Sequence, residues 1–274
     1  MLKTRILTAL LLGPLSIYAT LALPSRGFGL ILGLIFCLGA WEWASLARLV
    51  HSRSRLIFFA LFGGPLLALW LHGDSLVQLT LPAVQLASLW WLMALGCVLA
   101  YPRGRGWTRS PGTVSLVGLL SLLPAWMALV YLHERHGSGY ALLLFFLVWG
   151  ADIGAYFAGR ALGRRKLAPA VSPNKTWAGV GGGLTVGLIV ASGGAWLLGW
   201  PLRYWPVMIA IALCVVAFSI VGDLLESLLK REAGLKDSGR LLPGHGGMLD
   251  RIDSLLAAAP VFMLGLYLGP DILP

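Results

Sequence analysis

Acidic and basic side chains gather in two stretches near the C-terminal end of the 274-residue sequence. In the first stretch, one face of a helix would carry, at spacings i, i+3, i+4 and i+7, the residues Asp223, Glu226, Ser227 and Lys230. In the second, Asp250 and Asp253 are three residues apart at the start of an apolar run and would also share a face. The two stretches therefore combine candidate metal ligands with candidate phosphate-binding groups.

A loop rich in glycine separates these two stretches. Pro243 and four glycines between residues 236 and 247 force an irregular loop whose backbone can approach a ligand closely. Carboxylates suit Mg²⁺, which takes a few of them together with substrate phosphates, while lysine and arginine bind phosphate oxygens. This combination indicates phosphoryl or nucleotidyl transfer. By itself, the segment 223–231 would equally be a solvated charge network at a helix end.

His245 lies between the glycines of that loop. A lone histidine in such a place is more often a loop hydrogen-bonding residue than a catalyst, but a phosphate-binding or acid role stays open.

Two carboxylates lie inside apolar runs. An ionisable residue at the centre of a membrane helix costs about 2.5–3.5 kcal/mol on insertion, so each needs an explanation. Asp152 is expected to face a polar cavity or to pair with a neighbouring helix. Glu42, between Trp41 and Trp43, has no polar neighbours in sequence, so packing or helix pairing explains it at least as well as a function.

A second polar stretch covers residues 160–176. It lacks the spacing of a nucleotide-binding P-loop. Four of its residues could still donate hydrogen bonds to phosphates beside a helix N-terminus, namely Ser172, Asn174, Lys175 and Thr176. Its three consecutive cations are better explained as contacts to anionic lipid headgroups; these are Arg164, Arg165 and Lys166.

The composition shows what must position these residues. Hydrophobic residues make up 58% of the chain and charged residues only 12%, whereas a soluble domain has about 25% charged residues. Soluble globular, disordered and collagen-like classes are thereby excluded. The net charge of +10 comes from short basic clusters between long apolar runs, which is typical of membrane proteins and argues against a nucleic-acid partner.

Nine apolar runs are each near the length of about 20 residues that crosses a bilayer as a helix. They cover residues 6–23, 27–47, 56–71, 75–100, 113–132, 139–162, 177–200, 207–222 and 254–268. The sequence therefore predicts an all-α integral membrane protein, a polytopic bundle of about nine transmembrane helices. We expect one membrane domain over 1–274, in which 1–138 form N-terminal helices and 139–274 carry the catalytic site.

The basic residues also predict the orientation. With nine spans and a cytoplasmic N-terminus, 18 lysines and arginines fall on the cytoplasmic side and three on the other, as the positive-inside rule requires. The three are Arg26, Arg135 and Arg203. Both long polar stretches then lie on the cytoplasmic side, where we expect the chemistry.

The 27 residues 227–253 resemble the signature of the phosphatidate cytidylyltransferase (CDP-diacylglycerol synthase) family. The pattern is Ser-x-φ-Lys-Arg-x₄-Lys-Asp-x-Gly-x₂-Leu-Pro-x-His-Gly-Gly-φ-x-Asp-Arg-φ-Asp, with φ apolar, and every fixed position is filled. The segments 152–160 and 172–176 are similar to two further family motifs. One departure is Ala178, where the family pattern often has Glu. The resemblance covers about the C-terminal half.

The resemblance implies transfer of CMP from CTP to phosphatidate with Mg²⁺, giving CDP-diacylglycerol and pyrophosphate. It implies metal binding by Asp223 and Asp250, with Asp253 and Asp152 beside them. The remaining catalytic candidates are Lys230, Arg231, Lys236, Asp237, His245 and Arg251. The substrate-binding candidates are Asp152, Tyr156, Ser172, Asn174, Lys175, Thr176, Ser227, Gly246 and Gly247. A second cation and a homodimer stay open.

Two alternatives remain at this point. A CTP-dependent lipid kinase of the polyprenol type would use a related site but transfer the γ-phosphoryl group. A transporter would use Asp152 and Glu42 as coupling residues, but the sequence shows no inverted repeat. The resemblance favours cytidylyl transfer, with CTP, phosphatidate and membrane lipid as partners. It also implies a bacterial inner membrane with the site facing the cytoplasm.

Overall fold

The computed structural model describes residues 2–241, 244 and 246–269, and the side chains from residue 10 onward. Nine α-helices account for most of these residues. They are α1 (Leu2–Ala22), α2 (Ser25–Leu46), α3 (Ser52–Leu71), α4 (Gly73–Ala100), α5 (Pro111–Arg135), α6 (Ser138–Leu162), α7 (Trp177–Leu197), α8 (Trp205–Glu232) and α9 (Leu249–Tyr267). Two short 3₁₀ helices, Arg105–Arg109 and Leu202–Tyr204, precede α5 and α8.

Seven of these helices, α2 to α8, are long and apolar enough to cross a membrane. The chain is therefore an all-α integral membrane protein, as predicted. The other two predicted spans fall on α1, whose apolar part is the shorter Leu10–Ala22, and on α9. Helix α9 begins with Asp250, Arg251 and Asp253, so its first turns are polar.

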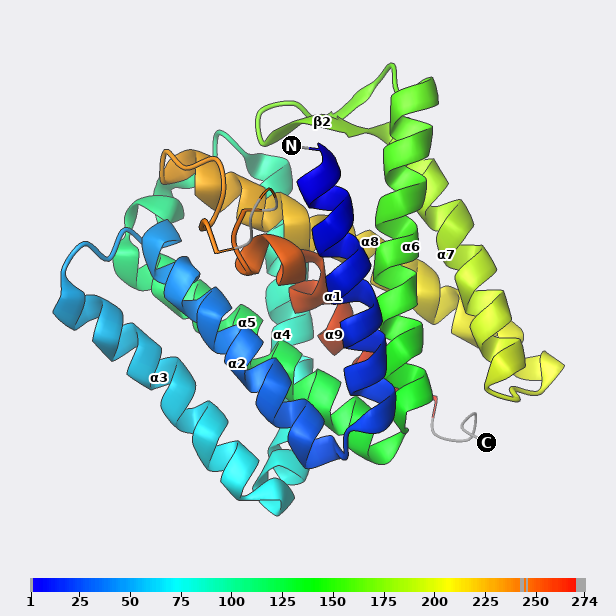
Figure 1. The fold of residues 1–274 in the computed structure, drawn as a ribbon. Coiled ribbons are helices and arrows are strands. Elements are labelled where there is room, and N and C mark those ends of the chain that lie inside the picture. The colour runs from blue at the N-terminus through cyan, green and yellow to red at the C-terminus, as the bar shows by residue number, and fades with distance from the viewer. Residues whose placement is uncertain (1, 242–243, 245, 270–274) are drawn as a thin grey trace.

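One element was not expected from the sequence. Residues between α6 and α7 form an antiparallel hairpin of β1 (Lys166–Ala168) and β2 (Ser172–Thr176), with Lys166 opposite Thr176 and Ala168 opposite Ser172. The hairpin projects from one end of the bundle (Figure 1). The hairpin brings Lys175 next to Asp223 of α8, although the two residues belong to separate polar stretches of the sequence.

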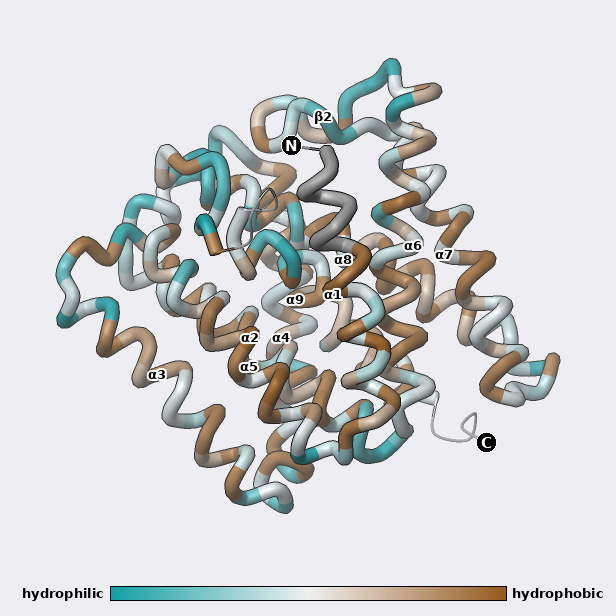
Figure 2. Tube along the Cα trace, in the orientation of Figure 1, coloured by the Kyte–Doolittle hydropathy of each residue, from teal (hydrophilic) through white to brown (hydrophobic). Residues whose placement is uncertain are grey.

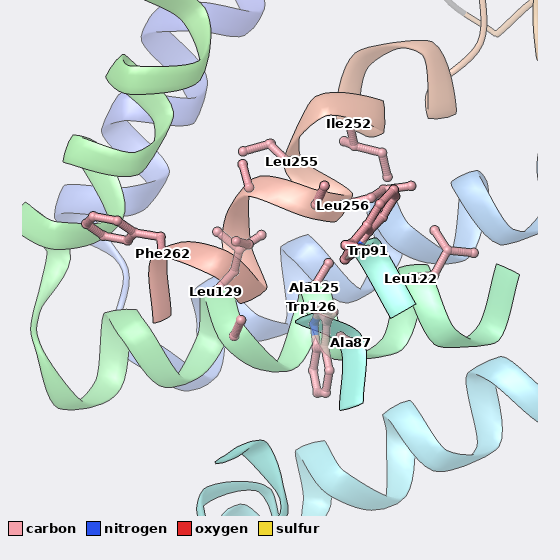
Figure 3. Close-up of a cluster of buried hydrophobic side chains, with 14 of the residues drawn as sticks. Ala87, Trp91, Leu122, Ala125, Trp126, Leu129, Ile252, Leu255, Leu256 and Phe262 are labelled. Atoms are coloured by element: carbon pink, nitrogen blue, oxygen red, sulfur yellow. The ribbon is translucent and has the colours of Figure 1, made fainter. Parts of the chain in front are cut away.

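Helix α9 lies inside the bundle, packed against α4, α5 and α8. Ala257, Ala258 and Ala259 are fully buried, which allows its neighbours to approach closely. Figure 3 shows its apolar side chains facing residues of α4 and α5, with Trp91 of α4 beside Leu256. This burial fixes the position of the first two turns of α9, which carry Asp250 and Asp253.

The connections alternate between the two ends of the bundle. The start of α1, the β hairpin and the α2–α3 and α4–α5 connections lie at one end, along the top and upper left of Figure 1. The described residues between α8 and α9, which are 233–241, 244 and 246–248 and are called the α8–α9 segment, lie at the same end. Hydrophilic residues gather at the ends and hydrophobic residues between them (Figure 2). Both polar stretches of the sequence are thus at the same end.

Helices α6 and α7 approach each other through glycines. A Cβ on Gly154 would meet the carbonyl of Gly182, and a Cβ on Gly182 would meet Ala158. Small residues at such a crossing let two membrane helices pack backbone to backbone. The close contact holds the hairpin between these helices over the polar end of the bundle.

Candidate active site

Four carboxylates from three helices meet at the polar end of the bundle. We refer to Asp152 of α6, Asp223 of α8, and Asp250 and Asp253 of α9 as the carboxylate cluster. The charge of Asp223 acts on both Asp152 and Asp253, and the charge of Asp152 acts on Asp253. Two lysines offset this negative charge, one from the hairpin and one from α8.

Lys175 of the hairpin pairs with Asp223. The distance between Lys175 Nζ and Asp223 Oδ2 is 2.7 Å, and the two side chains are 24% and 29% exposed. Ser227, one turn further along α8, donates to Asp223 Oδ1 at 3.2 Å. The predicted face of α8 is therefore formed, and Asp223 lies at an edge of the cluster that solvent reaches.

Lys230 is buried more deeply and joins two carboxylates. Its Nζ lies 2.6 Å from Glu226 Oε2 and 2.6 Å from Asp250 Oδ1. The side chains of Glu226 and Asp250 are 1% and 8% exposed. Within the described part of the chain, Glu226 Oε1 has no hydrogen-bond donor. An acceptor left in this state is unusual in a buried site.

The backbone of the α8–α9 segment holds the other oxygen of Asp250. Asp250 Oδ2 accepts hydrogen bonds from the N–H groups of Ser238 at 3.0 Å and Gly247 at 2.7 Å. Burial raises the pKa of Asp250, but the bonds from Lys230 and these two N–H groups outweigh it, so the pKa is lowered. Gly246 has φ +83°, and a Cβ there would meet Asp250 Oδ2, so only glycine fits.

Several other predicted residues lie at the surface of the structure. Arg231 approaches the carbonyl of Val171 in the hairpin at 3.5 Å. Tyr156 is exposed and accepts a bond from Arg160 at 2.9 Å. Also exposed, wholly or partly, are Ser172, Asn174, Lys236, Asp237 and Arg251. His245 lies outside the described residues.

Thr176 has a local role in the structure. Its Oγ1 accepts a hydrogen bond from Gly179 N at 3.1 Å, which caps the N-terminus of α7, and the residue is 5% exposed. A threonine immediately before a helix is a common N-cap, so this signal was present in the sequence. Capping explains the residue without a ligand.

A cavity of about 610 Å³ opens beside the cluster. Its polar end is formed by Asp152, Asp250, Arg251 and Asp253. Its walls come from α1, α2 and α6 and are mostly apolar, including Leu12, Ile31, Phe36, Phe145 and Trp149. A second cavity of about 380 Å³ lies at the opposite end of the bundle, around Trp70 and Glu134, away from the carboxylates.

Sequence reasoning missed two acidic residues at the site. The helical spacing correctly predicts that Glu226 shares a face of α8 with Asp223 and Lys230, but Glu226 is not among the predicted site residues. Glu42 of α2 was expected to pack or to pair helices, and it does contact α9: it accepts hydrogen bonds from Met248 N and Leu249 N. These residues are about 206 positions away in the chain, so no local pattern could reveal the contact.

Comparison with known proteins places the chain among enzymes. Residues 3–268 match the model of the cytidylyltransferase family. A phosphatidate cytidylyltransferase of Pseudomonas aeruginosa is 46% identical over 263 residues, covering 96% of both chains. The protein of that name from Haemophilus influenzae is 40% identical over 287 residues, covering 96% of this chain and 97% of the relative. The one from Brucella suis is 39% identical over 285 residues, covering 99% and 96%.

Proposed function

The chain belongs to the cytidylyltransferase family, and we propose that its reaction, the transfer of CMP from CTP to phosphatidate, takes place at the carboxylate cluster. One observation carries this proposal: carboxylates of α6 and α9 line the polar end of an apolar cavity, and Asp223 and Asp250 of the same cluster pair with two lysines. At such a place a lipid phosphate could react while its acyl chains stay in apolar surroundings, and a nucleotide could enter from water.

The bond changes follow from the two substrates. A phosphatidate oxygen forms a bond to the α-phosphorus of CTP, and the bond from that phosphorus to the oxygen that bridges the α- and β-phosphates breaks. The products are CDP-diacylglycerol and pyrophosphate. Phosphatidate is already ionised at neutral pH, so no side chain has to remove a proton. The main task of the site is to offset the repulsion between two anions.

The cluster has the capacity to bind Mg²⁺. Among the described residues, no three His, Cys, Asp or Glu side chains form a complete metal cage, but Mg²⁺ usually takes one or two carboxylates with substrate phosphates and water. Each carboxylate oxygen can accept two bonds, and Asp250 Oδ1 and both oxygens of Asp223 each accept one from the described residues. We propose that Asp223 and Asp250 hold the ion, with Asp253 and Asp152 beside it. When bound, Mg²⁺ would neutralise phosphate charge.

The lysines also keep donors available. An ammonium group has three N–H donors. Lys230 uses two of them on Glu226 and Asp250, and Lys175 uses one on Asp223. We propose that the remaining donors bind phosphate oxygens, together with Ser172 of the hairpin. Arg251 lies at the cluster, Arg231 and Lys236 are exposed cations of the same polar stretch, and we propose that the three draw in the nucleotide.

The cavity suits phosphatidate. Its apolar walls on α1, α2 and α6 would take the acyl chains, and Arg251 at its polar end would face the headgroup. We propose that all nine helices cross the membrane, that the site end is cytoplasmic, and that the membrane is the bacterial inner membrane. The 18 to three division of basic residues and the alternation of the connections in Figure 1 support this orientation.

Substitution of the two proposed metal ligands tests the site. Asp223→Asn and Asp250→Asn should each lower activity by more than about 100-fold at limiting Mg²⁺, beyond the usual effect of losing an outer-shell partner. Asp74→Asn is the matched control, because Asp74 is exposed at the opposite end of the bundle. Full activity of either test variant at limiting Mg²⁺ would remove the assignment.

A further inference from the structure

Glu42 of α2 binds the α8–α9 segment at three points. Its Oε1 accepts from Met248 N at 3.0 Å, and its Oε2 accepts from Leu249 N at 2.8 Å and Ser238 Oγ at 2.9 Å. The residue is 8% exposed, so water competes little for these bonds. Burial of a carboxylate is costly unless hydrogen-bond donors replace the water that it loses. Here Ser238, Met248 and Leu249 supply three such donors.

The contact completes the N-terminus of α9. The first N–H groups of a helix have no partner within it, and this end carries partial positive charge. Met248, the N-cap residue, makes no side-chain capping bond. Glu42 takes the N–H groups of Met248 and Leu249 instead, so a charge from another helix serves as the cap.

The same backbone that binds Glu42 also binds Asp250. Ser238 gives its hydroxyl to Glu42 and its N–H to Asp250. Gly247 gives its N–H to Asp250, and the next two N–H groups go to Glu42. Residue 238 and residues 247–249 therefore lie between two carboxylates, and a shift of this backbone would move Asp250 Oδ2.

Two glycines of the signature allow this approach. A Cβ on Gly239 would collide with the Glu42 carboxylate, and a Cβ on Gly247 would collide with both Glu42 and Ser238. Neither glycine is among those with positive φ. Close approach to Glu42, rather than backbone conformation, accounts for the absence of side chains at these two positions.

We propose that Glu42 is a positioning residue for the reaction: it fixes the α8–α9 segment and thereby holds Asp250 in the geometry that binds the metal. The metal part of this inference rests on the proposed function of Asp250. Glu42 lies behind the segment and acts through it, so its loss should weaken metal binding rather than remove a group that contacts substrate.

Amide hydrogen exchange tests the first half without metal or turnover. In metal-free full-length protein, Glu42→Ala should speed exchange in peptides covering residues 236–249, and Glu42→Gln, which keeps one acceptor oxygen, should do so less. Glu232→Gln is the matched control, because Glu232 accepts bonds from Tyr101 at 2.9 Å and Thr108 at 3.0 Å away from this segment. Exchange in Glu42→Ala equal to the wild type would overturn the proposal.

The Mg²⁺ dependence of activity tests the second half. Glu42→Ala should raise the half-saturating Mg²⁺ concentration by about 10–100-fold, the usual effect of losing a partner of a ligand, and excess Mg²⁺ should restore most of kcat. Should Glu42→Ala not fold, Glu42→Gln and Ser238→Ala carry the same test. A purely structural role would lower the yield of folded enzyme and leave the Mg²⁺ midpoint unchanged, which would overturn the proposal.

Failure of the proposed function would look different. Asp250→Asn with a wild-type Mg²⁺ midpoint would show that Asp250 is not a metal ligand, and would overturn the metal half of the inference together with that function. Faster exchange in Glu42→Ala would still report how the segment is held, so the two failures are separable.

Discussion

The two lysines at this site differ in how much their ion pairs contribute to the stability of the fold. Lys230 and Lys175 make the same type of ion pair at similar distances, but Lys230 is 12% exposed and joins two buried carboxylates. Removing one partner of a buried ion pair leaves an uncompensated charge, whereas a pair that solvent reaches contributes little to stability.

Lys230→Met should therefore lower both activity and stability. We expect a loss of about 3–5 kcal/mol in the free energy of unfolding, because Glu226 and Asp250 would both stay buried without the ammonium group that binds them. Lys175→Met should lower activity with a change in stability of less than about 1 kcal/mol. Thermal unfolding in detergent, measured beside the activity, separates the two. Equal destabilisation by both substitutions would contradict this difference.

At the scale of elements, the sequence predicted the helices better than the connections between them. The face of α8 followed from i, i+4 spacing, and the bonds from Ser227 to Asp223 and from Lys230 to Glu226 have that spacing. The meeting of Lys175 with Asp223 did not follow, because it depends on a hairpin that local composition did not indicate.

The contact of Glu42 with the start of α9 could not be predicted for a related reason. Its partners are fixed by how α2 and α9 pack, and the residues on either side of Glu42 in sequence are both tryptophans. Thr176 is the opposite case, since a threonine directly before an apolar run is a local signal for a helix cap. The roles of the predicted ligands were drawn from a family resemblance and stay predictions until measured.

Thr176→Ala tests whether this residue is a cap or a ligand. Loss of an N-cap bond should lower stability by about 0.5–2 kcal/mol. We expect kcat and both KM values per folded enzyme to stay near the wild type, because Thr176 Oγ1 is engaged with Gly179. Thr176→Ser, which keeps the hydroxyl, should restore the stability. A rise in the KM for CTP in Thr176→Ala that Thr176→Ser reverses would assign the residue to nucleotide binding instead.

At the scale of the whole molecule, the bundle places a polar site at the end of an apolar cavity. Helix α8 has 28 residues, about 42 Å at 1.5 Å per residue, which exceeds a hydrocarbon core of about 30 Å. Its last turns, from Asp223 onward, can therefore reach the membrane surface while the rest of the helix lies among apolar neighbours. The cavity between α1, α2 and α6 would connect the carboxylate cluster with the apolar interior of the membrane.

Filling the cavity tests its role in lipid binding. Gly13 of α1 lines it, and a Cβ there would meet nothing within 4 Å, so the backbone tolerates a larger residue. Gly13→Phe should raise the KM for long-chain phosphatidate several-fold and leave the KM for CTP unchanged. Gly64→Phe on α3 is the matched control, because Gly64 is also free of neighbours but lies outside the cavity. The same change in both variants would argue against a lipid site here.

This chain transfers a cytidylyl group to a lipid phosphate. The most direct measurement uses purified protein in detergent with phosphatidate, Mg²⁺ and CTP labelled separately at the α- and γ-phosphates. We predict that the α-label enters the lipid and the γ-label leaves as pyrophosphate, and that Asp223→Asn abolishes both. Entry of the γ-label into the lipid, with release of CDP, would show a kinase and contradict the claim.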